Sequence, residues 1–167
     1  SESKLDMDLI SEDTIADTII WAINDSLSDI AVGEIRAIYG RGFLVEEALG
    51  YTFRVYPFSF YQSNPTQART LFEIVRRLGG NGDRALDLYC GIGTISLIVS
   101  ENFDEVIGIE IEESSVKAAR ENAEMNDVEN ARFICGKVEE VLPTFDSMVD
   151  TIFVDPPRPG IHKRALK

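Results

Sequence analysis

The chain has 167 residues, of which 44% are hydrophobic and 27% are charged, and its formal net charge is −13. This length suits one ordinary domain with a small appendage, and no apolar run is long enough for a transmembrane span. The acidic excess argues against a stand-alone nucleic-acid binder, because phosphate recognition depends on Lys and Arg. The cysteines are too few for a disulfide framework or a zinc site, so no metal and a reduced, cytoplasmic setting are expected.

The N-terminal part of the chain is expected to form a small α+β segment. Residues 8–28 carry leucines and isoleucines at helical spacing, with acidic residues between them, which predicts an amphipathic helix. Residues 31–58 carry short runs of β-branched and aromatic residues, interrupted by glycines, which predict a small antiparallel meander. We therefore expect residues 1–57 to be the end of a central α+β domain, and residues 58–167 to be part of a different domain.

A helix and then alternating strands and helices are expected further along the chain. Asn64 and Pro65 fit the cap and the first position of a helix, which Gly79 and Gly80 would end. Between that helix and the end of the chain, apolar runs predict strands over 85–89, 105–110, 131–135 and 150–155, with helices over 94–100, 114–125 and 138–142. This alternation predicts an α/β fold with a parallel, doubly wound, Rossmann-like sheet.

A glycine-rich loop follows the first strand of this sheet, and acidic residues lie at the carboxyl ends of the strands. Gly91 and Gly93 would let the backbone approach a ligand closely. Glu110 follows Gly91 at about the spacing at which an acidic residue meets ribose hydroxyls in nucleotide-binding folds. Asp87 lies near the end of the first strand, and Asp155 closes the fourth. Ligands of open parallel sheets bind at these ends, so we expect a cofactor site there.

NAD and S-adenosylmethionine are the two cofactors considered for this loop. The dinucleotide fingerprint needs a third glycine where this chain has Ser96, and Asp87 would repel its pyrophosphate. S-adenosylmethionine carries a sulfonium and an ammonium group, which carboxylates attract. The residues therefore favour the methyl donor. Structural alternatives stay open: Glu110 could be a solvated strand end, Asp87 a helix-capping or loop-bracing acid, and Tyr89 a core residue.

A stiff turn is expected after the fourth strand, in the segment Asp155-Pro156-Pro157-Arg158-Pro159-Gly160. Its prolines would fix the direction of the Asp155 carboxylate. Methyltransferases that act on amino groups usually have an aromatic residue after the two prolines, and RNA cytosine-5 enzymes usually have a cysteine. Arg158 fits neither pattern. It could contact RNA phosphate or brace the loop, and a rigid loop without a catalytic role is the alternative.

Four segments together resemble the RNA uracil-5-methyltransferases, the family that modifies tRNA and 23S rRNA. They are FSFYQSN at 58–64, LDLYCGIGT at 86–94, VIGIE at 106–110 and DPPRPG at 155–160, in the family's order and spacing. The F-x-Q-x-N pattern in the first segment is the most specific. The resemblance implies a class I S-adenosylmethionine-dependent methyltransferase sheet, of which strands one to four are present here and the C-terminal strands are missing.

The resemblance also implies roles for individual residues. Cofactor contacts are expected from Gln62, Tyr89, Gly91, Gly93, Thr94, Glu110, Lys137 and Asp155, and substrate contacts from Phe60, Gln62, Asp155 and Arg158. The family's nucleophilic cysteine and general base are expected beyond Lys167, because Cys90 lies in the cofactor loop and Cys135 ends the third strand. RNA would be the substrate of the full-length enzyme, and no protein partner or membrane is inferred. A methyltransferase of another substrate (cytosine, an amino group or a small molecule) and a non-catalytic cofactor-binding module are the alternatives.

Overall fold

The structure, a computed structural model, describes residues 16–25, 33–158, 160–161 and 163–165. The described residues form two compact units. The first unit takes the residues up to Leu44 together with 56–58, and the second takes Val45–Val55 and the residues from Ser59 onward. No helix in the described ranges has the length and apolar character needed to cross a membrane.

The first unit is built on two antiparallel strands, β1 (Thr18–Ile23) and β2 (Glu34–Gly40). The helix predicted over residues 8–28 is therefore wrong where the structure describes it, and the rest of that range lies outside the described residues. The sequence Thr-Ile-Ile-Trp-Ala-Ile is compatible with a strand, because β-branched and aromatic residues favour a pleated surface. A short apolar run fits both the helical and the strand period of side chains, and pairing with β2 made this segment a strand.

The strands predicted within 31–58 form, but not as one meander. β3 (Leu44–Ala48) and β4 (Tyr51–Val55) make a separate two-stranded sheet, whereas β2 pairs with β1. Leu49 and Gly50, with φ of 50° and 90°, turn the chain between β3 and β4. Gly40 and Gly42 also have positive φ, of 83° and 75°, and this backbone breaks the run of strands before β3.

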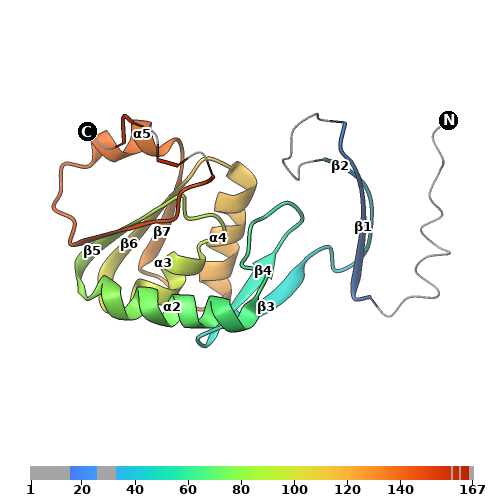
Figure 1. The fold of residues 1–167 in the computed structure, drawn as a ribbon, viewed down its shortest axis with the longest axis horizontal. Helices are drawn as coiled ribbons and strands as arrows, with labels where there is room; N and C mark the ends of the chain where they lie inside the picture. The colour runs from blue at the N-terminus through green and yellow to red at the C-terminus, as the bar shows by residue number, and fades with distance from the viewer. Residues whose placement is uncertain (1–15, 26–32, 159, 162, 166–167) are drawn as a thin grey trace. The chain divides into compact units, whose positions relative to one another are not determined.

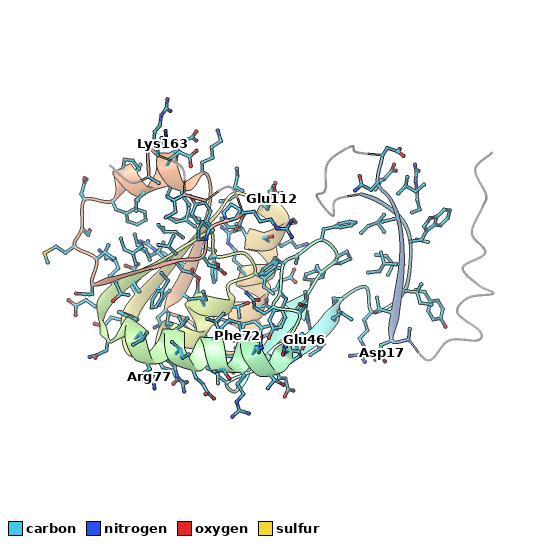
Figure 2. The ribbon with its side chains drawn as sticks, in the orientation of Figure 1. Asp17, Glu46, Phe72, Arg77, Glu112 and Lys163 are labelled. Atoms are coloured by element: carbon cyan, nitrogen blue, oxygen red, sulfur yellow. The ribbon has the colours of Figure 1, made fainter. Side chains whose placement is uncertain are left out.

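The predicted helix after Asn64 is confirmed as α2 (Pro65–Gly79). The side chain of Asn64 accepts a hydrogen bond from the backbone N–H of Gln67 at 3.1 Å, and Gly80 ends the helix with a φ of 69°. Phe72 points from α2 into the second unit, whereas Arg77 points away from it (Figure 2).

A four-stranded parallel sheet forms the centre of the second unit, in the order β7-β6-β5-β8. Its strands are β5 (Gly82–Leu88), β6 (Phe103–Glu110), β7 (Ala131–Cys135) and β8 (Thr151–Val154). The connections are α3 (Thr94–Val99) with the 3-10 turn η1 (Ser100–Asn102), α4 (Glu113–Met125), and α5 (Val138–Val141) with η2 (Leu142–Thr144). The predicted α/β, Rossmann-like fold is confirmed, and the four strands of this sheet, counted along the chain, lie in the order 3-2-1-4.

Helices cover both faces of this sheet: α2, α3 and α4 lie on one side and α5 on the other (Figure 1). Successive residues of β5 show the consequence, because Ala85 joins the cluster on the first face and Leu86 the cluster on the second, and both are buried. Strands buried on both faces have continuous apolar sequences, which is why the central strands β5 and β6 could be recognised in the sequence. The acidic residues of the predicted site lie instead at the carboxyl ends of the strands.

Candidate functional site

The backbone that leaves β5 adopts an unusual conformation. Tyr89, Gly91 and Gly93 have φ angles of 64°, 54° and 82°. A bulky residue such as Tyr89 in the left-handed region costs on the order of 1–3 kcal/mol, so surrounding contacts must hold it there. They include hydrogen bonds from the Cys90 N–H to the Ile109 carbonyl at 3.1 Å and from the Gly93 N–H to the Cys90 carbonyl at 2.9 Å. Strain of this kind clusters at functional sites.

The two glycines of the loop have different reasons to be glycine. A Cβ at Gly93 would lie 2.9 Å from the Cζ of Phe133 and 3.1 Å from the Cβ of Ala119, so packing excludes a side chain. A Cβ at Gly91 would meet no atom within 4 Å, so that position faces open space. Gly93 therefore packs the loop against the fold, and the backbone at Gly91 is left open.

The carboxylate of Glu110 holds this loop from the end of the neighbouring strand. Its Oε2 accepts a hydrogen bond from the Gly91 N–H at 3.1 Å. Its Oε1 accepts from the N–H groups of Ile111 at 2.8 Å and Glu112 at 3.0 Å. An ionised carboxylate has about four acceptor positions, so at least one remains for a ligand hydroxyl. Glu110 is a structured, half-buried acid rather than a freely solvated strand end.

Asp87 braces the start of α3 from inside the fold. Its Oδ2 accepts from both the N–H of Ser96, at 2.9 Å, and the Ser96 hydroxyl, at 2.6 Å. Its Oδ1 is buried without a hydrogen-bond partner among the described residues. The pKa of Asp87 is raised to about 7, mainly by burial; the hydrogen bonds from Ser96 lower it, and the charges of Asp155 and Glu110 raise it. These contacts favour the loop-bracing interpretation of Asp87, and they give Ser96 a role.

Three carboxylates thus lie at the carboxyl ends of three neighbouring strands: Glu110 on β6, Asp87 on β5 and Asp155 directly after β8. Their mutual influence is seen in the raised pKa of Asp87. Such a group of acids makes the edge of the sheet attractive to a cation and unfavourable to a pyrophosphate.

The remaining predicted site residues differ in their exposure to solvent and in their contacts. Thr94 is the first residue of α3 and is half-buried, as is Gln62 ahead of α2. Phe60 is 71% exposed, and Arg158 is also exposed. Lys137 is exposed, and its Nζ lies 3.0 Å from the Oε1 of Glu140. The structure therefore joins Glu110 directly to Gly91, and it pairs Lys137 with another surface side chain.

Neither cysteine is placed as an activated nucleophile. Cys90 is buried, and its Sγ covers Gly108 so closely that a Cβ at that glycine would lie 2.7 Å from the sulfur. Burial raises the pKa of the Cys90 thiol well above its usual value, and the charges of Asp87 and Glu110 act in the same direction. Cys135 is exposed, and its Sγ lies 3.5 Å from the Ile111 carbonyl oxygen.

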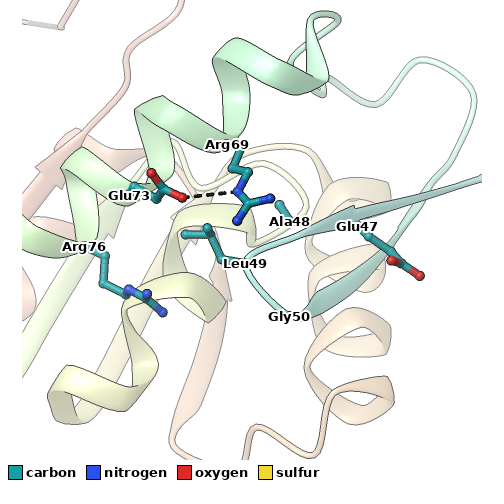
Figure 3. A pocket seen from close by; sticks show the side chains of 7 residues that line it. All are labelled: Glu47, Ala48, Leu49, Gly50, Arg69, Glu73 and Arg76. Atoms are coloured by element: carbon teal, nitrogen blue, oxygen red, sulfur yellow. Dashed lines mark hydrogen bonds and ion pairs between the residues drawn. The ribbon is translucent and has the colours of Figure 1, made fainter.

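A surface hollow of about 440 Å³ lies elsewhere in the second unit, between the β3–β4 turn and α2 (Figure 3). Arg69 and Arg76 reach it from α2, but Arg69 is paired with Glu73 across 3.2 Å. None of the predicted site residues lines it. The mixed charges and exposed ion pair give it no clear ligand.

Two residues that hold the surroundings of the glycine loop escaped the sequence analysis. Asn122 on α4 and Asn126, the residue that caps the end of α4, bind the backbone of β4, and Asn122 also binds the carbonyl of Ile92 inside the glycine loop. The signal that could have found them is their spacing of four residues on one helical face, combined with a polar residue where the apolar stripe of α4 should continue.

Comparison with known proteins places the chain in a family. The sequence profile for tRNA (uracil-5-)-methyltransferase matches residues 43–167. An uncharacterized RNA methyltransferase of Clostridium tetani is 43% identical over 152 residues, which cover 89% of this chain and 33% of that protein. A tRNA (uracil(54)-C(5))-methyltransferase of Pyrococcus furiosus is 35% identical over 152 residues, covering 91% of this chain and 36% of that protein.

A solved structure shares the fold as well as the sequence. The tRNA (uracil-54, C5)-methyltransferase of Pyrococcus abyssi, in complex with S-adenosyl-L-homocysteine, matches with a TM-score of 0.80 and 33% identity. The match covers 93% of this chain and 38% of that one. This chain spans about a third of the length of the curated relatives it matches. The resemblance carried by the four motif segments is thereby confirmed, and the chain belongs to the tRNA (uracil-5-)-methyltransferase family.

Proposed function

We propose that this chain forms the cofactor-binding part of an S-adenosylmethionine-dependent methyltransferase that modifies C5 of a uridine in tRNA or rRNA. The observation that carries the proposal is the 3.1 Å hydrogen bond from the Gly91 N–H to Glu110, which sets an acid beside the open glycine at the edge of the sheet. Family membership supports it, as do the uracil-54 enzymes of Pyrococcus furiosus and Pyrococcus abyssi, the latter with S-adenosyl-L-homocysteine bound.

The residues at the loop fit such a cofactor. Glu110 has acceptor capacity left for ribose hydroxyls, and the field of Asp155 and Glu110 suits a ligand that carries positive charge. When bound, S-adenosylmethionine would supply the methyl group. We propose cofactor contacts for Gln62, Tyr89, Gly91, Gly93, Thr94, Glu110 and Asp155. A contact from Lys137 would first require it to release Glu140.

The substrate side of the site is proposed to involve Phe60, Gln62, Asp155 and Arg158. The exposed ring of Phe60 offers an apolar surface on which an unstacked base can lie. The amide of Gln62 can both donate and accept, as the edge of a uracil requires. Arg158 would contact phosphate. Because the chain carries a net charge of −13, we propose that most of the basic surface for RNA belongs to other parts of a longer, cytoplasmic protein.

Calorimetry on this chain with S-adenosyl-L-homocysteine and with NAD tests the cofactor assignment. We expect saturable binding of the former and no binding of the latter, and tighter binding of NAD would contradict the proposal. The substrate assignment is tested with the full-length protein, radiolabelled cofactor and unmodified tRNA and rRNA transcripts. Label at C5 of one uridine is expected, whereas label on a cytosine or an amino group would replace the uracil assignment with another substrate.

A further inference from the structure

Two asparagines, Asn122 on α4 and Asn126 at the cap that ends it, hydrogen-bond to the backbone of β4 as a neighbouring strand would. The Oδ1 of Asn122 accepts from the Arg54 N–H at 2.8 Å, and the Oδ1 of Asn126 accepts from the Thr52 N–H at 2.8 Å. The Nδ2 of Asn126 donates to the Thr52 carbonyl at 2.7 Å, and the Nδ2 of Asn122 lies 3.4 Å from the Arg54 carbonyl. Four residues of helix rise about 6 Å, close to the roughly 6.6 Å spanned by two residues of strand. The two amides therefore match alternate residues of β4.

Asn122 has one contact that Asn126 lacks. Its Nδ2 donates to the carbonyl of Ile92 at 3.1 Å, whereas the second donation of Asn126 goes to the Asn122 carbonyl. Ile92 lies between Gly91 and Gly93, which both have positive φ. Because glycine has no side chain to restrict its backbone angles, hydrogen bonds are the main restraint on the orientation of these peptide groups. Asn122 is 0% exposed, so no water competes for this amide. One buried side chain therefore ties α4, β4 and the glycine loop together.

A residue of β4 also contacts the segment that carries the proposed substrate residues Phe60 and Gln62. Phe53, which lies between the two residues held by the asparagines, is 0% exposed, and its ring centroid is 6.2 Å from that of Tyr61. Tyr61 stands between Phe60 and Gln62 in the sequence. A chain of direct contacts thus runs from the Ile92 carbonyl through Asn122 and β4 to the segment that contains Gln62.

We propose that Asn122 is a positioning residue for methyl transfer. Its amide fixes the position of the glycine loop relative to β4, and thereby the position of the proposed cofactor residues relative to the proposed substrate residues near Gln62. The inference rests on the proposed function for its catalytic meaning. It assigns Asn122 no contact with cofactor or base, because its polar atoms are used within the fold. Asn126 binds the same strand without touching the loop, so it is a matched control.

The test compares Asn122→Asp with Asn126→Asp in this chain. Each change keeps the shape of the side chain and the acceptor for β4, and each removes the Nδ2 donor, but only Asn122→Asp frees the Ile92 carbonyl. In the ligand-free protein we expect hydrogen exchange at the Gly91 and Gly93 amides to be about tenfold faster in Asn122→Asp than in Asn126→Asp, the change that loss of one buried hydrogen bond would produce. We expect a similar, roughly tenfold, difference in the dissociation constant of S-adenosyl-L-homocysteine.

Asn122→Ala and Asn126→Ala serve as a second pair if a buried carboxylate prevents folding. Equal exchange at the loop amides in both members of a pair would overturn the proposal, as would faster exchange with unchanged affinity. Failure of the wild type to bind S-adenosyl-L-homocysteine would instead refute the proposed function, and the exchange comparison alone would then decide whether Asn122 positions the loop.

Discussion

The backbone N–H of Gly91 donates a 3.1 Å hydrogen bond to the Oε2 of Glu110, which lies 19 residues later in the chain. The glycine loop and the acid at the end of β6 are therefore one structural unit rather than two separate motifs. The same carboxylate accepts from the first backbone N–H groups after β6. A change at Glu110 is expected to act on the shape of the loop as well as on the ligand.

Replacing Glu110 should weaken cofactor binding. We expect Glu110→Ala to reduce the affinity for S-adenosyl-L-homocysteine by about 1–3 kcal/mol, because ligand hydroxyls and loop N–H groups lose their acceptor. Calorimetry measures this, with Glu113→Ala as the control, since Glu113 is an exposed acid in the first turn of α4. An unchanged affinity in Glu110→Ala would show that this acid does not hold the ribose.

The raised pKa of Asp87 should make stability depend on pH. Asp87 holds its proton up to about pH 7 in the folded protein, against an ordinary pKa of 3.8. Between these values the folded state binds more protons than the unfolded one, so the stability from protonated Asp87 is lost as the pH rises through about 7. Asp87→Asn has no proton to lose, and its free energy of unfolding should rise relative to wild type by up to about 1.4 kcal/mol per pH unit in this window.

Urea unfolding at several values between about pH 5 and pH 8 measures that difference. Asp83→Asn, at the exposed start of the same strand, controls for the loss of a surface charge. A constant difference between Asp87→Asn and wild type across the range would show that Asp87 does not titrate there.

Gly79 should not tolerate a side chain, although it lies at the end of a helix. A Cβ there would be 2.5 Å from the Cζ and 2.7 Å from the Cε1 of Phe153. In an open helix Gly→Ala would stabilise by about 0.5–1 kcal/mol, but here overpacking against β8 should destabilise by about 1–3 kcal/mol. Chemical denaturation decides the sign, with Leu78→Ala, at a side chain that is 75% exposed, as the control. Relief of the loss in a Gly79→Ala, Phe153→Leu double variant would identify the clash as its cause.

The two thiols should differ in reactivity. Cys135 is exposed and Cys90 is buried with a raised pKa, so a thiol reagent should modify Cys135 quickly in the native protein and Cys90 only on unfolding. The absorbance of the chromophore that the reagent releases gives the number of modified thiols, and Cys135→Ser should abolish the fast phase of modification. Rapid modification of Cys90 in native Cys135→Ser would mean that the loop opens readily.

The same burial bears on catalysis in the full-length enzyme. A nucleophilic cysteine must reach the substrate as a thiolate, and Cys90 is placed for packing instead. Full-length Cys90→Ala and Cys135→Ala are therefore expected to retain methylation of RNA in the radiolabel assay. If either variant loses all turnover while still folded and able to bind the cofactor, that cysteine is the nucleophile.

Much of the second unit could be predicted from the sequence, because its signals are local. Asn64 and Pro65 start α2, and Gly80 ends it, through caps that need only neighbouring residues. The two central strands of the parallel sheet, β5 and β6, are buried on both faces, so each contains a short apolar run between turns. The glycine loop and Glu110 were recognisable from residue type and spacing, and the fold joins them through the hydrogen bond from Gly91 to Glu110.

Features that depend on contacts between residues far apart in the sequence were decided only by the tertiary structure. The segment of β1 has apolar residues that fit either period, and pairing with β2 made it a strand. Ser96 looked like a missing glycine until the fold brought its hydroxyl to Asp87, and burial then set the pKa of that acid. Asn122 looked like a polar residue on a helix, and only the approach of β4 and the Ile92 carbonyl gave its amide partners. The spacing of Asn122 and Asn126 could mark them as a pair, but it does not identify their partners, since the fold decides which backbone groups come near each amide.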